Sequence, residues 1–490
     1  VTRLIFGPEM NVQAPPNLSA GALPRLVAAG INDWGGVSPV TPDFVNPEAP
    51  WPHLDRLALD TADAGKQLTE RLTIYPRHAL DPDRWLAAGL RTRVRRAVDT
   101  DGFARVERWT PGVAEAPPEQ ELSRVGAPSV RRSHDLEAVL DRARRGERLE
   151  VNEIERLFAS RGEDFTRVCR TADQLRAEVN GDEVTWVVNR NINYTNVCYF
   201  RCRFCAFSKG KLSENLRGRP YDLSLEEIAR RTSEAWDRGA TEVCMQGGIH
   251  PSYTGDTYLE IVRTVKAAAP EMHVHAFSPL EIWQGAATLD LPLDEYLGRL
   301  RVAGLGSLPG TAAEVLHDEV RVVLCPDKIS TDQWLEVMAA AHRVGLRSTA
   351  TIMFGHVDAP RHWAHHLLAV RDLQERSREH GAGFTELVPL PFVPIEAPIY
   401  LQGEARFGPT FREAVLMHAV ARLVLHPHIE NIQASWVKMG PEGVLACLQA
   451  GANDLGGTLM NESITRAAGA AWGEELPPAR LDELIGSIGR

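Results

Sequence analysis

The chain has 490 residues and a formal net charge of −11, from 54 Lys and Arg against 65 Asp and Glu. Its composition, 44% hydrophobic and 24% charged, is that of an average globular protein and excludes a chain that is disordered throughout. The diffuse acidic charge gives no basic surface for nucleic acid or an anionic membrane, and the lack of an apolar run of 18 residues argues against a membrane span.

The first 50 residues repeat a pattern that occurs again near the end of the chain. Asn11–Ala14 resembles Asn431–Ala434 at an offset of 420, and Ala29–Gly36 resembles Ala450–Gly457 at an offset of 421. Two matches in nearly one register indicate an internal repeat. Because the second copies contain the last strands predicted below, we expect residues 1–110 to be the C-terminal remnant of a first, related barrel. We also expect the chain to be the tail of a longer two-barrel protein, with its two strand pieces poorly ordered or donated to another chain.

The next segments predict helices, a linker and a helical cap, in that order. Residues 44–110 contain the helical patterns Pro52–Ala64 and Pro82–Val98, which are typical of the final helices of such a barrel. Residues 111–132 are rich in Pro, Glu, Ala and Gly and predict a linker. Residues 133–183 predict an N-terminal cap of charged amphipathic helices. These cap helices are Asp135–Arg145, Val151–Ser160 and Phe165–Asn180.

From residue 184 onward, short β-branched runs alternate with amphipathic helical patterns. This order predicts an α/β fold, a (β/α)₈ TIM-type barrel with C-terminal helices over 184–490. Ser224 predicts the start of a helix over Leu225–Arg238, and Gly239 predicts its end. The candidate strands are 184–191, 240–246, 272–277, 304–307, 346–353, 384–389, 429–434 and 452–456.

Three of the seven cysteines fall within eight residues, as Cys198-x-x-x-Cys202-x-x-Cys205, on the loop after the first predicted strand. With cysteine at about 1 residue in 70, this spacing is expected roughly 0.001 times by chance, which indicates a metal site. Three thiolates suit a 4Fe–4S cluster with one open iron, whereas structural zinc, which stays open as an alternative, needs four ligands. An odd, low cysteine count without a secretory pattern predicts a reducing, cytoplasmic location.

The cysteine triplet, with the aromatic Phe204 before its last cysteine, resembles the motif of radical S-adenosylmethionine enzymes. The resemblance implies a 4Fe–4S cluster held by the three cysteines, with S-adenosylmethionine bound beside it. Some of the implied cofactor contacts have an alternative, structural role. The glycines can form a plain turn, and the glutamate can interact with a helix dipole. These contacts are Gln246, Gly247 and Gly248 after the second predicted strand, and Ser307 and Glu314 after the fourth.

Four longer stretches of sequence assign the resemblance to a smaller group within these enzymes. Asn189–Cys198, Cys205–Ser208, Gln246–Pro251 and Gly451–Glu462 together are similar to the deazaflavin-forming group, specifically the 4-hydroxyphenyl transferase half of FO synthases. This implies that a 5′-deoxyadenosyl radical drives transfer of the 4-hydroxybenzyl group of L-tyrosine to 5-amino-6-(D-ribitylamino)uracil, with a flavodoxin- or ferredoxin-type electron donor. The resemblance also implies two fused barrels, the first closing the ring and the second making the transfer, and this order agrees with the internal repeat. Because the chain contains one cysteine triplet, it does not itself carry the ring-closing activity. A polypeptide with the missing first-barrel portion would be a further partner.

Several polar side chains on or after the predicted strands are candidates for lining the substrate site. A hydrogen-bonded packing role is the alternative for each of them. The candidates are His250, His275, His356 and Asn453, with His273 and Glu386 as further polar positions. Two other functions stay open: a radical enzyme of the aminofutalosine-type menaquinone pathway, whose motifs are similar, and a non-catalytic metal-binding scaffold.

Overall fold

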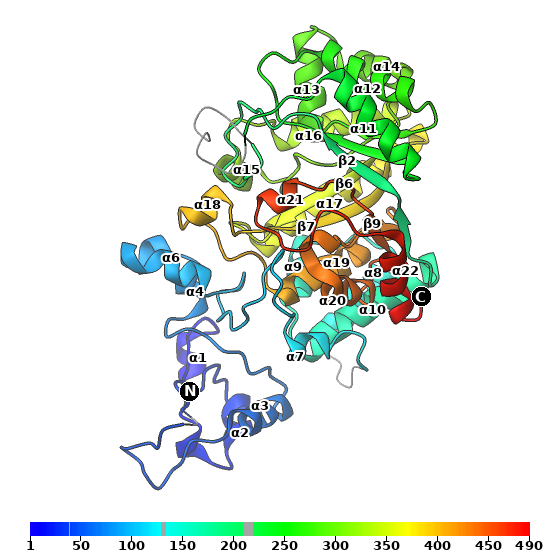
Figure 1. Ribbon diagram of the computed structural model, residues 1–490. Coiled ribbons are helices and arrows are strands. Elements are labelled where there is room, and N and C mark those ends of the chain that lie inside the picture. The colour runs from blue at the N-terminus through cyan, green and yellow to red at the C-terminus, as the bar shows by residue number, and fades with distance from the viewer. Residues whose placement is uncertain (39, 129–133, 209–218) are drawn as a thin grey trace. The chain divides into compact units, whose positions relative to one another are not determined.

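The computed structural model describes residues 1–38, 40–128, 134–208 and 219–490 and divides into two compact units, Val1–Leu72 and Thr73–Arg490 (Figure 1). The predicted division at residue 110 differs from this one, because residues 73–110 pack within the larger unit. Among the described residues, no helix combines the length and the apolar character that crossing a bilayer requires.

In the small unit, the two predicted strand pieces pair with each other. Gln13 and Asp33 form a parallel bridge, so the two pieces are partners of each other rather than unpaired. Trp34 packs against Leu23 and Leu57 in a small apolar cluster. The helices of this unit are α1 (Thr2–Phe6), the 3-10 helix η1 (Asn17–Ser19), α2 (Leu23–Ala28) and α3 (Leu54–Asp63).

The large unit contains a closed parallel barrel. Strands β2 to β8 form a seven-stranded parallel sheet in sequence order, and β1 pairs with β9. Parallel bridges from Gln433 to Asp454 and from Arg190 to Met460 complete the ring. Because β1 and β2 are consecutive pieces of one strand, the nine segments fill the eight positions of the predicted barrel. The strands are β1 (Thr185–Val187), β2 (Asn189–Asn193), β3 (Glu242–Gln246), β4 (His273–Ala276), β5 (Ser307–Leu308), β6 (Arg347–Phe354), β7 (Phe384–Pro391), β8 (Asn431–Ile432) and β9 (Asp454–Gly457).

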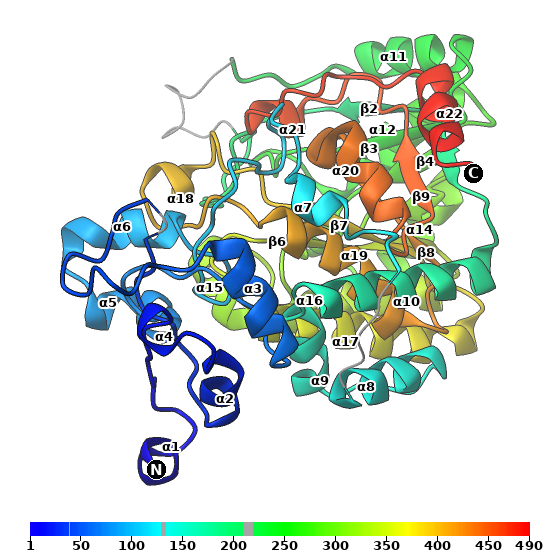
Figure 2. The same cartoon turned by 90° about the horizontal axis from the view of Figure 1, so that it is seen from below.

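Helices surround the barrel, as Figure 2 shows from below. The first of them, α11 (Leu225–Asp237), begins where predicted, since the Ser224 side chain accepts a hydrogen bond from the Glu227 N–H. Gly239, with φ of 85°, follows its end. The remaining elements of this part are α12 (Gly255–Ala268), α13 (Pro279–Thr288), α14 (Leu293–Ala303), α15 (Asp318–Leu324), α16 (Thr331–Arg343), α17 (Pro360–Ser377), η2 (Arg378–His380), α18 (Pro398–Leu401), α19 (Phe411–Leu425), α20 (Trp436–Leu448), α21 (Ile464–Ala467) and α22 (Pro478–Ser487).

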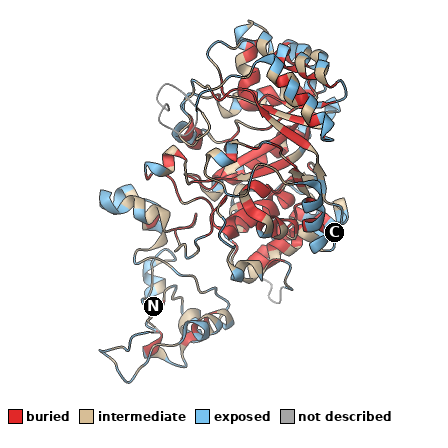
Figure 3. Cartoon of the chain, in the orientation of Figure 1, coloured by how far each residue is buried: buried red, intermediate tan, exposed pale blue. Residues whose placement is uncertain are grey.

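The predicted cap helices form an outer layer on the side of the barrel. Helices α8 (His134–Arg144), α9 (Val151–Phe158) and α10 (Glu163–Asn180) pack on α17 and α19 (Figure 1). Every residue of α19 is buried as a result (Figure 3), which explains why this helix is apolar on nearly all sides. Phe158 packs edge-on against Trp363, with ring centres 5.0 Å apart.

Residues 73–110 lie against the large unit's own helices. The sequence predicts one helix over Pro82–Val98, but the structure has two, because Leu86 is extended (φ −120°, ψ 141°). The Thr100 N–H donates to the Glu413 carboxylate at 2.7 Å, which ties this segment to α19. The helices here are α4 (Pro76–Ala79), α5 (Pro82–Trp85) and α6 (Ala88–Arg96).

The predicted linker is attached to the barrel in its described part, 111–128, whereas residues 129–132 lie outside the described residues. The Gly112 N–H donates to the Lys438 carbonyl at 2.7 Å, and the Gly112 carbonyl accepts from the Ala471 N–H at 2.8 Å. A short helix, α7 (Glu119–Leu122), follows. The backbone of Gly112 therefore ties this predicted linker to the barrel.

The small unit reproduces the hydrogen bonds of β8 and β9 at the offsets of the sequence repeat. In both places, two backbone bonds join the paired strand pieces, at 2.8 to 3.1 Å. In the barrel they join Ala434 to Asp454 and Asn453 to Ile432; in the small unit they join Ala14 to Asp33 and Asn32 to Val12. The repeat thus extends from sequence to hydrogen-bond geometry.

An arginine supports each copy of this motif. Arg422 Nε donates to the Gly451 carbonyl at 2.9 Å, and Arg422 Nη2 donates to Asn453 Oδ1 at 2.7 Å. Arg3 makes the corresponding two bonds at 2.9 and 3.1 Å. Arg422 is buried, however, whereas Arg3 is partly exposed.

This difference predicts unequal effects of the same substitution in the two copies. Arg422→Met is expected to lower the free energy of unfolding of the barrel by about 3 kcal/mol, because buried acceptors lose their donor. Arg3→Met is the matched control and is expected to leave that transition within about 0.5 kcal/mol. Urea titrations followed by circular dichroism would check this. Equal shifts for both variants would contradict the assignment of Arg422 as a barrel-stabilising residue.

Candidate functional site

A cavity of about 270 Å³ opens at the carboxyl ends of the barrel strands. Its lining residues come from the ends of β3, β6 and β7 and from the loops that follow β2, β4, β5, β8 and β9. Loops from different strands converge here because all the strands are parallel, which is why active sites of such barrels occur at this end.

All three cysteines of the triplet line this cavity. Their loop is held by neighbouring loops through the backbone of Arg203: its N–H donates to the Leu324 carbonyl at 2.8 Å, and its carbonyl accepts from the Ile399 N–H at 2.7 Å. The sequence between these cysteines therefore needs no regular secondary structure of its own, because the barrel loops around it supply its hydrogen-bond partners.

The donor set favours a cluster over a single zinc ion. Three thiolates line the cavity, which suits a 4Fe–4S cluster with one open iron, whereas structural zinc takes four protein ligands. Elsewhere in the described part of the chain, at the starts of α15 and α17, three possible ligand side chains have all their ligand atoms within 4.8 Å of one another: His317, Glu319 and His362.

Glu314 and Lys328 form a buried ion pair in the cavity wall beside the cysteines. Lys328 Nζ lies 2.7 Å from Glu314 Oε1 and 5.4 Å from the centre of the Phe204 ring. Burial lowers the pKa of Lys328, but Cys202 and Glu314 raise it by more, so the lysine remains a cation. Glu314 Oε2 is buried without a hydrogen-bond partner in the described part of the chain. That oxygen is an acceptor available to a ligand in the cavity.

The turn Gln246–Gly248 also lines the cavity, where β3 ends. A Cβ on Gly248 would lie 2.3 Å from the Val197 carbonyl oxygen, so glycine lets this turn pack directly on the cysteine loop. The Gly247 N–H donates to Glu281 Oε1 at 3.2 Å. The geometry places the turn and the cysteine loop in one wall, as the expected cofactor contacts require.

Ser307 lies elsewhere. It is at the start of β5, in register with His275, and is not among the lining residues. Its hydroxyl is hydrogen-bonded to His273 Nε2 at 2.8 Å and to His275 Nδ1 at 2.7 Å. The expected contact of Ser307 with S-adenosylmethionine is therefore not supported by this geometry, because the hydroxyl lies deeper in the barrel and is already engaged.

Two of the four expected substrate-lining side chains have structural roles. His356 is fully buried, its Nε2 is hydrogen-bonded to the Met353 carbonyl at 2.9 Å, and its Nδ1 accepts from the Val357 N–H at 2.7 Å. Asn453 lies before β9, at the opposite end of the barrel, where its side chain accepts from Arg422. Neither residue lines the cavity, so both expectations are corrected here.

The other two candidates have different surroundings. His250 follows the lining residue Ile249, and its Nδ1 is hydrogen-bonded to Ser252 Oγ at 2.7 Å, outside the lining of the cavity. His275 on β4 is in register with Cys244 on β3. Cys244 lies two residues before the lining residue Gln246 and so on the same face of its strand. His275 therefore points into the barrel, below the cavity. It remains a candidate for contact with a ligand that enters the barrel.

The barrel interior below the cavity is polar. Barrels of this type are usually filled by bulky apolar side chains, yet the inward positions here carry amides, histidines and a carboxylate that keep some accessible surface. Burial, and then the carboxylates of Asp454 and Glu242, raise the pKa of Glu386 well above its usual value. A polar, incompletely filled interior suits a ligand rich in hydrogen-bonding groups. The inward residues are Asn191, Cys244, His275, Ser307, Glu386 and Gln433.

Sequence reasoning missed three charged lining residues, Glu281, Lys328 and Lys438. Glu281 and Lys438 follow β4 and β8, so their place directly after a barrel strand was a usable signal. Lys328 follows α15 instead, and nothing in the local sequence indicates that this loop returns to the cysteines.

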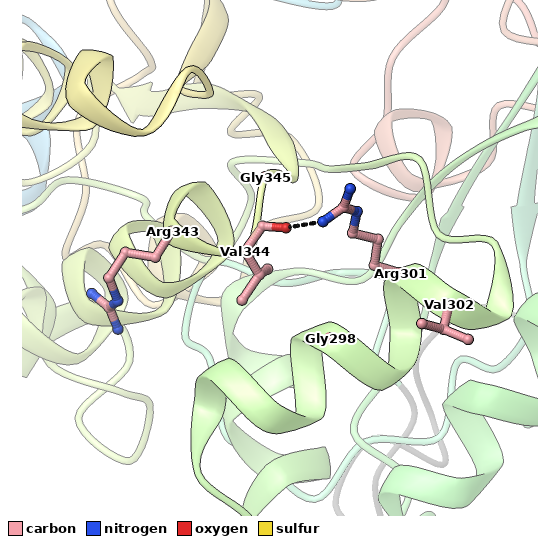
Figure 4. Close-up of a pocket in the computed structure, with 6 residues that line it drawn as sticks. All are labelled: Gly298, Arg301, Val302, Arg343, Val344 and Gly345. Carbon is pink, nitrogen blue, oxygen red and sulfur yellow. Dashed lines mark hydrogen bonds between the residues drawn. The ribbon is translucent and has the colours of Figure 1, made fainter.

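A second hollow lies between the C-terminal ends of α14 and α16, where Arg301 donates to the Val344 carbonyl at 2.6 Å (Figure 4). Barrel helices run antiparallel to the strands, so these helix ends lie toward the amino ends of the strands. Residues at that end of a barrel serve stability. This hollow is therefore not a candidate active site.

Comparisons with known proteins support the family resemblance that the cysteine triplet carries. Residues 192–369 match the radical SAM superfamily, and residues 381–476 match the CofH/MqnC C-terminal region. The FO synthases of Streptomyces coelicolor and Mycobacterium tuberculosis are 44% and 45% identical to the chain over its whole length. The chain spans only 60% and 61% of their length. The 5-amino-6-(D-ribitylamino)uracil–L-tyrosine 4-hydroxyphenyl transferase of Methanopyrus kandleri is 48% identical over 66% of this chain and 86% of its own length.

Solved structures support the fold. Methylornithine synthase (PylB) matches with a TM-score of 0.55 at 19% identity, covering 72% of this chain and 96% of that protein. The [FeFe]-hydrogenase maturase HydG matches with a TM-score of 0.56 at 15% identity, covering 76% of this chain and 78% of that one. At such identities the likeness concerns the barrel alone, and it confirms the predicted fold class.

Proposed function

Because the chain belongs to the radical SAM superfamily, and within it to the family of the 4-hydroxyphenyl transferases, we propose that it joins the 4-hydroxybenzyl group of L-tyrosine to 5-amino-6-(D-ribitylamino)uracil. The observation that carries this proposal is one cavity that combines the cysteine triplet, the turn Gln246–Gly248 and Glu314 above a polar barrel interior. The menaquinone-pathway alternative is not favoured, since the relatives matched over the whole chain are FO synthases.

The residues fit the cofactors that the family implies. Cys198, Cys202 and Cys205 would hold a 4Fe–4S cluster, since all three line the same cavity. The turn Gln246–Gly248 and the unpaired Glu314 Oε2 would bind S-adenosylmethionine. When bound, cluster and S-adenosylmethionine together supply a 5′-deoxyadenosyl radical, for which a flavodoxin- or ferredoxin-type donor would provide the electron.

The chain's own residues would bind the substrates and exclude water. Apolar side chains of the cavity wall, among them Phe200, Phe204 and Phe392, limit access of solvent to the reacting atoms. The polar interior, including His275 and Glu386, offers hydrogen bonds for a ribityl chain and a uracil ring. Holding both substrates in one enclosed site lets a benzylic fragment add to the uracil before it escapes.

The experiment that tests this proposal is an anaerobic assay of the reconstituted, reduced enzyme. The complete mixture contains S-adenosylmethionine, L-tyrosine and the ribitylaminouracil, and mass spectrometry measures 5′-deoxyadenosine and the adduct. We expect both products in the complete mixture and no adduct when either substrate is omitted. Formation of 5′-deoxyadenosine without adduct would reject this substrate pair, and the absence of both from a cluster-loaded enzyme would favour the scaffold function.

We further infer that residues 1–110 are the C-terminal remnant of a related barrel. The repeated hydrogen bonds of the small unit support this, since they match those of β8 and β9 at the sequence offsets. A polypeptide that carries the rest of such a barrel would then be a partner. Free cysteines and an iron–sulfur cluster suit a reducing compartment such as the cytoplasm.

A further inference from the structure

Lys438 differs from the other charged residues of the cavity lining because its side chain has neither an ion-pair partner nor a hydrogen-bond partner in the described part of the chain. The described lining contains four charged side chains, two glutamates and two lysines. Lys328 is paired with Glu314, and Glu281 accepts hydrogen bonds from the Ser278 and Gly247 N–H groups. For Lys438, no ion pair within 4.0 Å occurs among residues 1–38, 40–128, 134–208 and 219–490.

The carboxylate that acts electrostatically on Lys438 already accepts hydrogen bonds from other groups. Glu462, which follows β9, is the one acidic residue that affects Lys438 electrostatically. Its two oxygens accept from the N–H groups of Thr465 at 2.8 Å and Arg466 at 3.4 Å. Burial lowers the pKa of Lys438 to about 8, so the ammonium is held in the cavity without the partner that would stabilise its charge.

The backbone of Lys438 is fixed from both sides. Its N–H donates to the Ser435 carbonyl at 3.2 Å, and its carbonyl accepts from Gly112 at 2.7 Å. Gly440, with φ of 70°, ends the first turn of α20 just beyond it. The backbone from which this side chain extends into the cavity lining is therefore held in place.

That part of the cavity is distinct from the expected cofactor contacts. The cysteine loop, the turn Gln246–Gly248 and Glu314 come from β2, β3 and β5, whereas Lys438 follows β8. The elements on either side of β8 in the barrel, β7 and the segment after β9, contribute mainly apolar side chains to the lining, among them Leu390, Phe392 and Ile464, together with the polar Thr465. A cation beside an apolar wall matches an amino acid that carries both a carboxylate and an aromatic ring.

We infer that Lys438 binds the α-carboxylate of the amino-acid substrate and so selects a free amino acid over the corresponding amine. This rests on the proposed function, because it takes the amino acid to be tyrosine. The carboxylate of S-adenosylmethionine has the same chemistry and is the second possible source of the anion. The binding experiment separates the two.

The test compares L-tyrosine with tyramine, which lacks the carboxylate, on wild type and Lys438→Met. Dissociation constants are measured by calorimetry on the cluster-loaded enzyme with S-adenosylmethionine present. Lys438→Met is expected to weaken tyrosine binding about 30-fold, as for loss of a charge-assisted hydrogen bond, while tyramine binding changes less than about twofold. Lys438→Arg, which keeps the charge, is expected to retain most of the affinity for tyrosine.

Three results would overturn this inference: equal losses for tyrosine and tyramine, unchanged tyrosine binding in Lys438→Met, or a selective loss of affinity for S-adenosylmethionine. Iron content and thermal unfolding of the variant report whether it is folded and loaded. The failure of this inference is distinguishable from that of the proposed function. In the first case the wild type still forms the adduct from tyrosine, and in the second it does not.

Discussion

Cys202→Ala is expected to remove the iron–sulfur cluster and with it all radical chemistry. Cys202 is one of only three cysteines that line the cavity in the described part of the chain, so no spare thiolate is placed to replace it. After anaerobic reconstitution, iron content and the cluster absorbance should fall to background, and 5′-deoxyadenosine formation should fall by about 10³-fold or more, beyond the usual effect of losing a ligand-supporting residue.

Cys325→Ala provides the matched control. Cys325 is buried near the same loop but is not a lining residue, and burial raises the pKa of its thiol to about 11. This variant should keep its cluster and its activity within about threefold, with only a modest loss of stability from the removed sulfur. Retention of the cluster by Cys202→Ala, or its loss from Cys325→Ala, would show that the ligand set is different from the one assigned.

Glu314→Gln is expected to weaken binding of S-adenosylmethionine about 100-fold. The substitution removes the charge of the carboxylate whose Oε2 faces no protein donor, and it leaves Lys328 buried without its counter-ion. Truncating one partner of a buried charge pair costs about 2–5 kcal/mol, which corresponds to this range of affinity. Equilibrium dialysis with the reconstituted enzyme measures the dissociation constant.

The double variant Glu314→Gln/Lys328→Met separates stability from binding. Removing both charges relieves the uncompensated lysine, so the double variant should unfold at a higher urea concentration than Glu314→Gln alone. Its affinity for S-adenosylmethionine should stay low. If the double variant bound S-adenosylmethionine as tightly as wild type, Glu314 would be a partner of Lys328 only and not a ligand contact.

The barrel could be predicted from sequence because short segments that contain β-branched and other apolar residues alternate with clear helix signals. Strand 346–353, for example, agrees within one residue with β6 (Arg347–Phe354). The helix after Ser224 agrees equally well, since its cap is a local hydrogen bond. The fourth strand was harder to place: of the predicted range 304–307, only Ser307 lies in β5, which is Ser307–Leu308.

The features of the fold and of the site that could not be predicted depend on contacts between residues far apart in the sequence. A local sequence pattern contains no information about such contacts. The placement of Lys328 follows from the return of its loop to Glu314, and the burial of His356 follows from the packing of its loop at the end of β6. The segment 111–128 has the composition of a linker, yet its backbone is hydrogen-bonded to Lys438 and Ala471. The cysteine triplet was recognisable from spacing alone because its chemistry needs three thiolates close together in sequence.

The most direct test of the central claim follows the aromatic ring of the substrate. The reduced, cluster-loaded enzyme is supplied with S-adenosylmethionine, the ribitylaminouracil and L-tyrosine whose phenyl ring is labelled with ¹³C. The account predicts that the uracil product carries the complete ring label and that 5′-deoxyadenosine accumulates with it. Accumulation of 5′-deoxyadenosine while the label stays in tyrosine or in a small phenol, with the uracil unlabelled, would contradict it.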